Sequence, residues 1–266
     1  MDLHLTGKRA LVTGGSRGIG RAIARQLALE GCDVVIAARD PIALDAAARE
    51  LAAETGRKVL GLTVETREDA SVKALVDGTL AALGGVDILV NAAAKPGGQA
   101  PSPKLAEVTD ALFWDDVDVK VMGYLRLARE VAPHMAAQRW GRIINISGLA
   151  ARQTGSIIGS IRNVAVAALT KNLADELGPK GINVTVVHPG LTRTEKTGPL
   201  VAGIAARSGD APDDVEKRLA ANVSIGRIVD AHEVADIVAF LASPRSVAIN
   251  GDAIAAGGGA RGAIHY

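Results

Sequence analysis

The residues with the most definite chemical meaning are the glycines of the run Thr13-Gly14-Gly15-Ser16-Arg17-Gly18-Ile19-Gly20. An apolar stretch, residues 10–12, precedes this run, and residues 19–27 after it have the spacing of a helix. Glycines let the backbone turn tightly and approach phosphate groups closely, and the free amides of a helix N-terminus bind the negative charge. This order therefore predicts a binding site for the diphosphate of a nucleotide. The residues expected to form it are Gly14, Ser16, Arg17, Gly18, Ile19 and Gly20.

Apolar runs of strand length alternate with helical patterns along most of the chain, and these elements must position the glycine loop. Besides 10–12, strands are predicted at 34–37, 59–62, 88–91, 143–147, 184–187 and 252–255. Helices are predicted from 19 to about 31 and at 41–55, 70–83, 111–137, 161–177, 215–221 and 233–241, with a disturbance at Pro133. The repeated order predicts an α/β fold, a doubly wound, seven-stranded parallel sheet with helices on both faces.

The composition is that of one large domain, residues 1–266, with 48% hydrophobic but only 2% aromatic residues. Such a core must consist of Ala, Val, Ile and Leu, which suit buried parallel strands. The net charge of +1 argues against nucleic acid as a partner. The single cysteine, Cys32, fits a reducing compartment, and neither a signal peptide nor a membrane span is recognisable. We therefore expect a cytoplasmic protein without a membrane partner, and we predict no metal site.

Residues 192–222 form the least regular part of the chain, with Gly, Pro and short apolar pieces. This segment is either a lid over a bound ligand or an ordinary surface insertion. The lid is favoured, because binding residues often lie on such segments.

Five sequence marks, spread over nearly the whole chain, make it similar to the short-chain dehydrogenase/reductase family. They are the run 13–20, Asn91-Ala92-Ala93-Ala94, Asn145-Ile146-Ser147, His188-Pro189-Gly190, and Asn250-Gly251-Asp252 with Gly257-Gly258-Gly259. The resemblance implies a Rossmann-like fold, a nicotinamide dinucleotide, and reduction of a carbonyl or oxidation of an alcohol. It also implies a homotetramer or homodimer, for which the long helices around Tyr124 and Val166 would supply the interface.

The family usually carries its reaction on Asn, Ser, Tyr and Lys, and this chain departs from that set. The tyrosine phenol transfers the proton, and the lysine ammonium lowers the pKa of that phenol. Alignment on Leu169-Thr170-Lys171 places Gly159 at the tyrosine position and Asn163 at the lysine position. Alignment on Gly123 places Lys120 at the asparagine position.

Two interpretations of these departures stay open. Either ordinary chemistry has been lost while the fold and the cofactor pocket remain, or Lys120 and Asn163 have exchanged places and Lys120 still brings an ammonium to the nicotinamide ribose. Ser147 is present, although the commoner serine position corresponds to Gly148. The proton would then come from Ser147, from Lys120 or from a water held by Asn163, and these three are the candidate catalytic residues.

Other polar residues near the vacated tyrosine position have ordinary explanations. Tyr124 is one helical turn from Lys120, and packing is a better explanation for it than proton donation; the only other tyrosine is Tyr266. Arg152, Gln153 and Arg162 flank the position and suit an anionic or carbonyl group, although solvated arginines are the usual case.

The cofactor is expected to be NADP rather than NAD. The family reads the ribose 2′ position after the second strand, where an acidic residue selects NAD. Here that position is Ala38, followed by Arg39, and Arg17 lies in the glycine loop. Two guanidinium groups suit a 2′-phosphate, unless Asp40 pairs with Arg39. The resemblance assigns the remaining cofactor contacts to Thr63, Val64, Asn91, Ala92, Ala93, Pro189, Gly190 and Thr194.

Three functions fit these observations. The favoured one is an atypical oxidoreductase for a small carbonyl or alcohol substrate. The others are a non-redox enzyme, such as a lyase, hydrolase or isomerase, that reuses the pocket, and a non-catalytic cofactor-binding or assembly protein.

Overall fold

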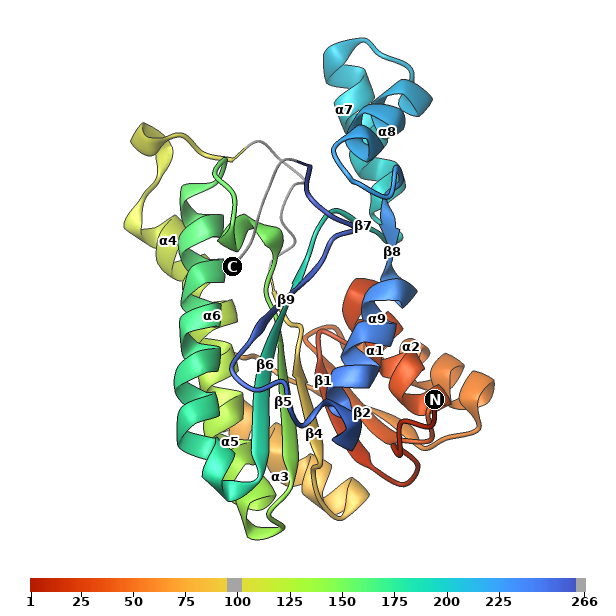
Figure 1. Ribbon diagram of the computed structural model, residues 1–266, viewed down its shortest axis with the longest axis vertical. Coiled ribbons are helices and arrows are strands. Elements are labelled where there is room, and N and C mark those ends of the chain that lie inside the picture. Colours follow the sequence, from red (N-terminus) through yellow and green to blue (C-terminus); the bar gives the residue numbers. More distant parts are fainter. Residues whose placement is uncertain (95–101, 262–266) are drawn as a thin grey trace.

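The computed structural model describes residues 1–94 and 102–261, and its centre is a parallel sheet (Figure 1). In the described residues, seven strands form this sheet in the order β3-β2-β1-β4-β5-β6-β9, with every neighbouring pair parallel. They are β1 (Arg9–Thr13), β2 (Asp33–Ala38), β3 (Val59–Thr63), β4 (Ile88–Asn91), β5 (Gly141–Ile146), β6 (Ile182–Pro189) and β9 (Ala253–Ala256). The strand order changes direction between β1 and β4, which makes the carboxyl ends of these two strands the expected ligand site. The predicted seven-stranded sheet is confirmed.

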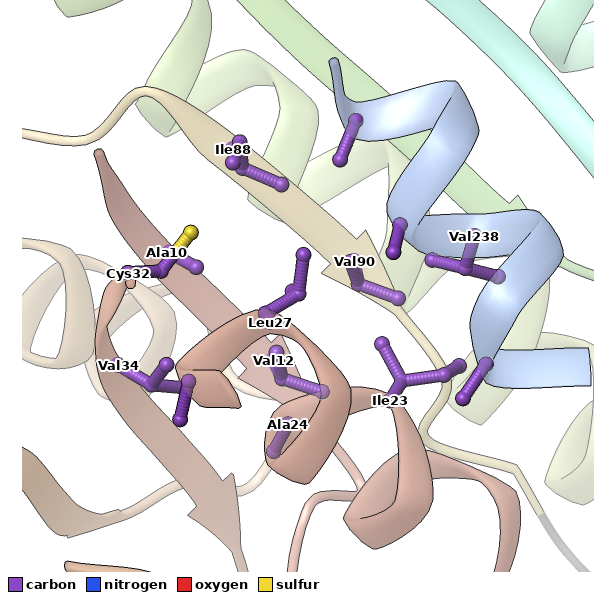
Figure 2. Packing of buried hydrophobic residues seen from close by; sticks show 14 of the residues in the cluster. Ala10, Val12, Ile23, Ala24, Leu27, Cys32, Val34, Ile88, Val90 and Val238 are labelled. Carbon is purple, nitrogen blue, oxygen red and sulfur yellow. The ribbon is translucent and has the colours of Figure 1, made fainter. Parts of the chain in front are cut away.

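Helices cover both faces of the sheet because consecutive strand residues point to opposite sides. Ala10 and Val12 belong to a core under α1 (Gly18–Leu29), α2 (Pro41–Thr55) and α9 (Ala231–Ala242). Leu11 lies between them and belongs to a second core, under α3 (Asp69–Leu83), α5 (Gly123–Ala137) and α6 (Ile157–Leu177). Figure 2 shows the first core, in which Ile23 and Leu27 of α1 lie against Val90 and close to Val238 of α9. Aliphatic side chains thus fill the core, as the composition predicts.

The long helical stretch before β5 is interrupted at a place that the sequence does not announce. Pro133, where the sequence predicts a disturbance, lies inside α5 and does not end that helix, although a proline cannot donate the backbone hydrogen bond of a helix interior. Instead, α4 (Asp110–Val117) and α5 are joined by a π-helical turn, η2 (Asp118–Met122). Wide turns of this kind occur frequently at functional sites. This one contains Lys120, and it buries that side chain.

Residues 192–222 are more regular than expected. They contain β7 (Thr192–Arg193), which pairs with β8 (Val229–Asp230), and the helices α7 (Thr197–Ser208) and α8 (Pro212–Ala221). The sequence predicts part of α8 but not α7. The two helices share a small apolar cluster with Val201 and Val215 at its centre, and they stand beyond the carboxyl ends of the strands (Figure 1).

The remaining elements are short. They are the 3-10 turns η1 (Leu105–Glu107), η3 (Leu149–Ala151), η4 (Gly178–Lys180) and η5 (Pro244–Ser246). Among the described residues, no helix has the length and apolar character that crossing a membrane requires.

A buried polar chain ties together three elements that carry the site. Asn91 Nδ2 at the end of β4 donates to Asn145 Oδ1 of β5 at 2.9 Å. Asn145 Nδ2 donates in turn to Thr170 Oγ1 of α6, also at 2.9 Å, and all three residues are buried. A buried polar group that loses its partner costs free energy, so this chain fixes the distance between the two strand ends and α6.

We therefore expect Asn145→Ala to lower the free energy of unfolding by about 2 kcal/mol, because it leaves the Asn91 amide without an acceptor and removes the donor to Thr170. Urea unfolding followed by circular dichroism measures the change. The control is Asn172→Ala, which removes an exposed amide from α6, the helix that carries Thr170. Equal effects of the two substitutions would contradict a special role for the buried chain.

Candidate active site

The glycine loop between β1 and α1 is packed so tightly that two of its positions exclude a side chain. A Cβ atom on Gly20 would lie 2.3 Å from the Gly14 carbonyl oxygen. A Cβ atom on Gly14, which has a φ of +70°, would lie 2.8 Å from the Ala92 carbonyl oxygen. These contacts bring the loop, the start of α1 and the end of β4 together, and they form the backbone cradle that a diphosphate requires.

The N-terminus of α1 offers its amides to an anion. Its N-cap residue, Arg17, makes no side-chain capping bond, whereas Asp40 caps α2 through the amides of Ile42 and Ala43. The Gly18 amide donates to Glu195 Oε2 at 3.3 Å, so a carboxylate from the segment after β7 lies where the diphosphate is expected. The helix end thus already binds negative charge, and the residues present fit a dinucleotide.

A cavity of about 560 Å³ extends from this loop along the carboxyl ends of the strands. Most of the predicted cofactor-binding residues lie in its wall: Gly14, Ser16, Arg17, Gly18, Ile19, Gly20, Arg39, Val64, Ala92, Ala93 and Thr194. A second cavity, of about 640 Å³, adjoins it, and Pro189 and Gly190 lie in the wall of that one. The two cavities share wall residues, including Ser147 and Arg162. We call them the cofactor cavity and the second cavity.

Two predicted cofactor-binding residues are not brought into either wall. Thr63 is the last residue of β3 and is exposed, and its neighbour Val64 takes the place in the cofactor cavity. Asn91 is fully buried in the polar chain described above. In the structure, Asn91 therefore joins the ends of β4 and β5 through its hydrogen bond to Asn145, and it does not line the cavity.

Arg17 of the glycine loop and Arg39, which follows β2, both lie in the wall of the cofactor cavity. Arg39 is largely exposed, and its guanidinium is 3.9 Å from a Glu65 carboxylate oxygen. Asp40, the possible competitor for Arg39, directs its carboxylate to the N-terminus of α2. Arg17 and Arg39 are therefore both available to a phosphate at this end of the cavity.

Lys120 is the central side chain of the candidate catalytic group. It comes from the π-helical turn η2, is 3% exposed and lies in the wall of the cofactor cavity. Its Nζ donates to the Ser147 carbonyl oxygen at 3.0 Å and to Asn163 Oδ1 at 2.9 Å. The structure thus brings together the three candidate catalytic residues that the sequence indicates.

The surroundings of Lys120 weaken its hold on a proton. Burial and, to a smaller extent, the nearby Arg162 guanidinium lower the pKa of its ammonium group to about 7, while the Asp116 carboxylate acts in the opposite direction. Arg162 and Asp116 form an ion pair with each other. An ammonium has three N–H groups, and two of those on Lys120 are used. Lys120 can therefore exchange a proton near neutral pH.

The sequence alignment matches Gly159 to the tyrosine of the family, and a glycine places no side chain there. Gly159 lies in the wall of the second cavity, and its amide donates at 3.0 Å to Ser156 Oγ, which caps α6. Ser147 Oγ donates to the Asn163 carbonyl oxygen at 3.1 Å. The second cavity thus ends at Ser147 and Asn163, without an aromatic side chain among its described wall residues.

Tyr124, the tyrosine that the structure describes, does not take the vacant place. Tyr124 is buried against Val166 and Val186, and its hydroxyl donates to the Ile146 carbonyl oxygen at 3.0 Å. Burial raises the pKa of this phenol, and Tyr124 lies in the wall of neither cavity, so packing explains it. Tyr266 is outside the described residues.

Sequence reasoning missed Glu195 and Asp116 as parts of the site, and it favoured a solvated loop over an anion-binding role for Lys196. Glu195 and Lys196 lie in the cofactor cavity wall, and Asp116 pairs with Arg162. The position of Thr194 beside Glu195 and Lys196 was the available signal for these two residues. Arg152, by contrast, donates to the Ala253 carbonyl oxygen and has a structural role.

Comparison with known proteins agrees with this geometry. The family model described as enoyl-(acyl carrier protein) reductase matches residues 14–261. A putative ketoacyl reductase of Streptomyces coelicolor is 35% identical over 258 residues, which cover 94% of this chain and 95% of the relative. The 3-oxoacyl-(acyl-carrier-protein) reductase FabG of Aquifex aeolicus is 32% identical over 262 residues, which cover 97% and 99%.

Among solved structures, the L-sorbose reductase of Gluconobacter frateurii, complexed with NADPH and L-sorbose, has a TM-score of 0.93 at 30% identity. The match covers 99% of this chain and 100% of that one. The cofactor expected from Arg17 and Arg39 is therefore also the one bound by this neighbour. Fold, glycine loop and relatives agree, and the chain belongs to the short-chain dehydrogenase/reductase family.

Proposed function

We propose that this protein is an NADPH-dependent reductase of small carbonyl compounds in which Lys120 replaces the usual tyrosine and lysine. One observation carries the proposal: the Lys120 amine is held by Ser147 and Asn163 at the wall of the cofactor cavity, with a pKa of about 7. The oxidoreductase activity itself is supported by relatives and structural neighbours that are reductases.

The residues divide the binding of the cofactor among themselves. The amides of the glycine loop hold the diphosphate, with Gly18 released from Glu195, and Arg17 and Arg39 hold the 2′-phosphate. Pro189, Gly190 and Thr194 face the nicotinamide end, where the two cavities adjoin. When bound, NADPH supplies a hydride to the carbonyl carbon.

This chain's own residues manage the proton. Ser147 and Asn163 line the second cavity, where the carbonyl oxygen is placed, and both contact Lys120. In its ammonium form, Lys120 has a third N–H group that is not donated to Ser147 or Asn163. We assign to this group the proton that the carbonyl oxygen takes up, transferred through a water held beside the Asn163 amide. The room left by Gly159 is sufficient for such a water.

Three further features belong to the proposal. Residues 192–222 act as a lid, because Thr194, Glu195 and Lys196 reach the cofactor cavity. The protein forms a homotetramer or homodimer through exposed apolar side chains of α4 and α6, because Tyr124 and Val166 themselves are buried within the subunit. The exposed side chains are those of Leu112, Trp114, Ile157, Ile161 and Val164. The single cysteine, Cys32, is buried and free, which fits a reducing compartment and supports a cytoplasmic location.

The decisive experiment is a fluorescence titration with NADPH and NADH, followed by a stopped-flow search for NADPH oxidation by a panel of small ketones and aldehydes. The proposal expects tight NADPH binding and oxidation by some of these carbonyl compounds. Tight binding without oxidation by any of them would favour a non-redox enzyme or a non-catalytic protein. Absence of dinucleotide binding would contradict the interpretation of the glycine loop.

We expect kcat/KM for carbonyl reduction to be constant at low pH and to fall about tenfold per pH unit above pH 7. Lys120 donates only while it is protonated, and its pKa is about 7. Lys120→Met should lower kcat/KM by about 10²- to 10⁴-fold and remove this descending limb. Steady-state kinetics from pH 5.5 to 9 test both effects, at about half-unit steps. An unchanged pH profile in the variant would rule out Lys120 as the donor.

The apparent exchange of Lys120 and Asn163 can be tested by exchanging them back. We expect Lys120→Asn and Asn163→Lys each to weaken NADPH binding, since one variant has no ammonium and the other places two cations side by side. The double variant restores one lysine and one asparagine, and its affinity should return to within a few-fold of the parent. Additive losses in fluorescence titrations would show that the two positions are not equivalent.

Arg39→Gln should weaken NADPH binding about tenfold and leave NADH binding unchanged, because only NADPH carries the phosphate that Arg39 contacts. Fluorescence titration gives both dissociation constants. Arg49→Gln is the matched control, since Arg49 is an exposed arginine on α2 that pairs with Asp45. A parallel loss of affinity for both cofactors would contradict the assigned role of Arg39.

A further inference from the structure

The second cavity carries positive charge without a side-chain carboxylate to balance it. Arg162 and Lys196 lie in its wall, and no aspartate or glutamate does so among the described residues. The stretches 95–101 and 262–266 also contain no aspartate or glutamate in their sequences. Among the residues that the structure describes, Arg162 pairs with the carboxylate of Asp116, and Asp116 lies in neither wall.

Arg162 is a desolvated guanidinium with an unused donor. The residue is 9% exposed, and its Nη1 donates to Asp116 Oδ1. Its Nε is buried and has no acceptor in the described part of the chain. Leaving a buried donor of a charged group unpaired costs free energy, and a planar guanidinium accommodates a second carboxylate on its free edge. Arg162 therefore has hydrogen-bonding capacity beyond its ion pair with Asp116, and it lies in the wall of the second cavity.

The helix that carries Arg162 presents two further features on the same side. Gly159, Arg162 and Asn163 have the spacing i, i+3 and i+4, which places them on one face of α6, and all three lie in the wall of the second cavity. Gly159 leaves open the space that a tyrosine would fill. Lys120 fixes the Asn163 side chain through Oδ1, so that Nδ2 points toward Gly148, from whose Cβ position it would be 3.2 Å away. This amide is a second donor for an anion placed there.

Lys196 faces the same region from the segment after β7. It lies in the walls of both cavities, and no described carboxylate forms an ion pair with it. The remaining wall of the second cavity includes aliphatic side chains that leave room for a short carbon chain: Leu149, Leu191, Leu200, Leu219 and Val223. Charge and apolar surface therefore adjoin each other in this cavity.

We propose that the substrate is a short aliphatic oxo acid whose carboxylate is bound by Arg162, with the Asn163 amide and Lys196 as supporting donors. This inference rests on the proposed reductase function. In the reaction, the carbonyl carbon gains a hydride supplied by NADPH and the carbonyl oxygen gains a proton from Lys120. The products are the hydroxy acid and NADP⁺, and the carboxylate is unchanged.

A bound carboxylate also acts on the proton donor. Lys120 is in the electrostatic reach of Arg162 on α6, which disfavours its ammonium form, and of Asp116 on α4, which favours it. An anion on Arg162 offsets the first influence and shifts Lys120 toward the protonated form. The descending limb of the kcat profile, which reports the substrate-bound complex, should accordingly lie at higher pH for an oxo acid than for a neutral ketone of the same size.

The test compares 3-oxobutanoate with its methyl ester, which has the same reactive carbonyl but no charge. We expect kcat/KM to be at least tenfold higher for the acid. Arg162→Gln should lower the acid-to-ester ratio at least tenfold, and this ratio cancels any effect on the chemistry that the two substrates share. Arg129→Gln, an exposed arginine on α5, is the matched control. An ester that is reduced as well as the acid, or a ratio unchanged by Arg162→Gln, would overturn the proposal while the reductase function stands.

Calorimetric titration of the NADP⁺ complex with butanoate and butanamide provides a readout that needs no turnover. We expect butanoate to bind and butanamide not to bind, and we expect the binding of butanoate to depend on Arg162.

The two experiments separate the two proposals. If neither 3-oxobutanoate nor its methyl ester is reduced but butanoate still binds through Arg162, the anion site is supported and the reductase function fails. If butanoate does not bind, the anion site fails. Should Arg162→Gln not fold, Lys196→Gln on the segment after β7 replaces it. We expect this variant to lose several-fold in affinity for butanoate, and Lys217→Gln on α8 is its control.

Discussion

The structure depends on a contact that only glycine permits, the approach of the start of α1 to the loop after β1. A Cβ atom on Gly20 would overlap the Gly14 carbonyl, and one on Gly14 would overlap Ala92. Because these three backbones meet, the N-terminus of α1 opens at the point where the strand order changes direction between β1 and β4. Both cavities follow from this arrangement, since the chain leaves the paired strands β1 and β4 toward opposite faces of the sheet and their carboxyl ends stay uncovered. The helix dipole and free amides then give the site its preference for anions.

The second constraint is the cost of burying Lys120. Removing an ammonium from water is unfavourable, and two neutral acceptors compensate only part of that cost. The pKa of the group is therefore about 7 instead of about 10, which suits Lys120 both to bring an ammonium to the cofactor and to transfer a proton. In the usual family arrangement a phenol transfers the proton and a lysine adjusts the phenol's pKa. In the mechanism proposed for this protein, burial adjusts the pKa of the lysine directly, so that a separate phenol is not required for proton transfer.

The sequence predicts the repeated strand–helix order and the loop, because both depend on local signals. The pattern of residues 41–55 with Gly56 after it, for example, gives the bounds of α2. The π-helical turn at 118–122 could not be predicted, since its irregularity arises from packing and has no glycine or proline to mark it. Helix α7 was missed for a similar reason, as Gly198 and Pro199 conceal a helix start whose stability comes from contact with α8. The resemblance placed Lys120 opposite Asn163, but only the structure shows that they touch.

The site has two places suited to an anion, the N-terminus of α1 and the edge of Arg162 that does not face Asp116, and a carboxylate of the chain occupies the first. Glu195 reaches the amide of Gly18, while nothing comparable among the described residues reaches the free edge of Arg162. A carboxylate on a surface segment is readily displaced by a diphosphate, because water replaces the contact that it loses. The Arg162 guanidinium keeps its ion pair with Asp116, and its Nε has no acceptor among the described residues. The first site therefore exchanges a protein anion for a cofactor, whereas the second gains an interaction only when a ligand arrives, which makes charge a strong basis for discriminating between substrates.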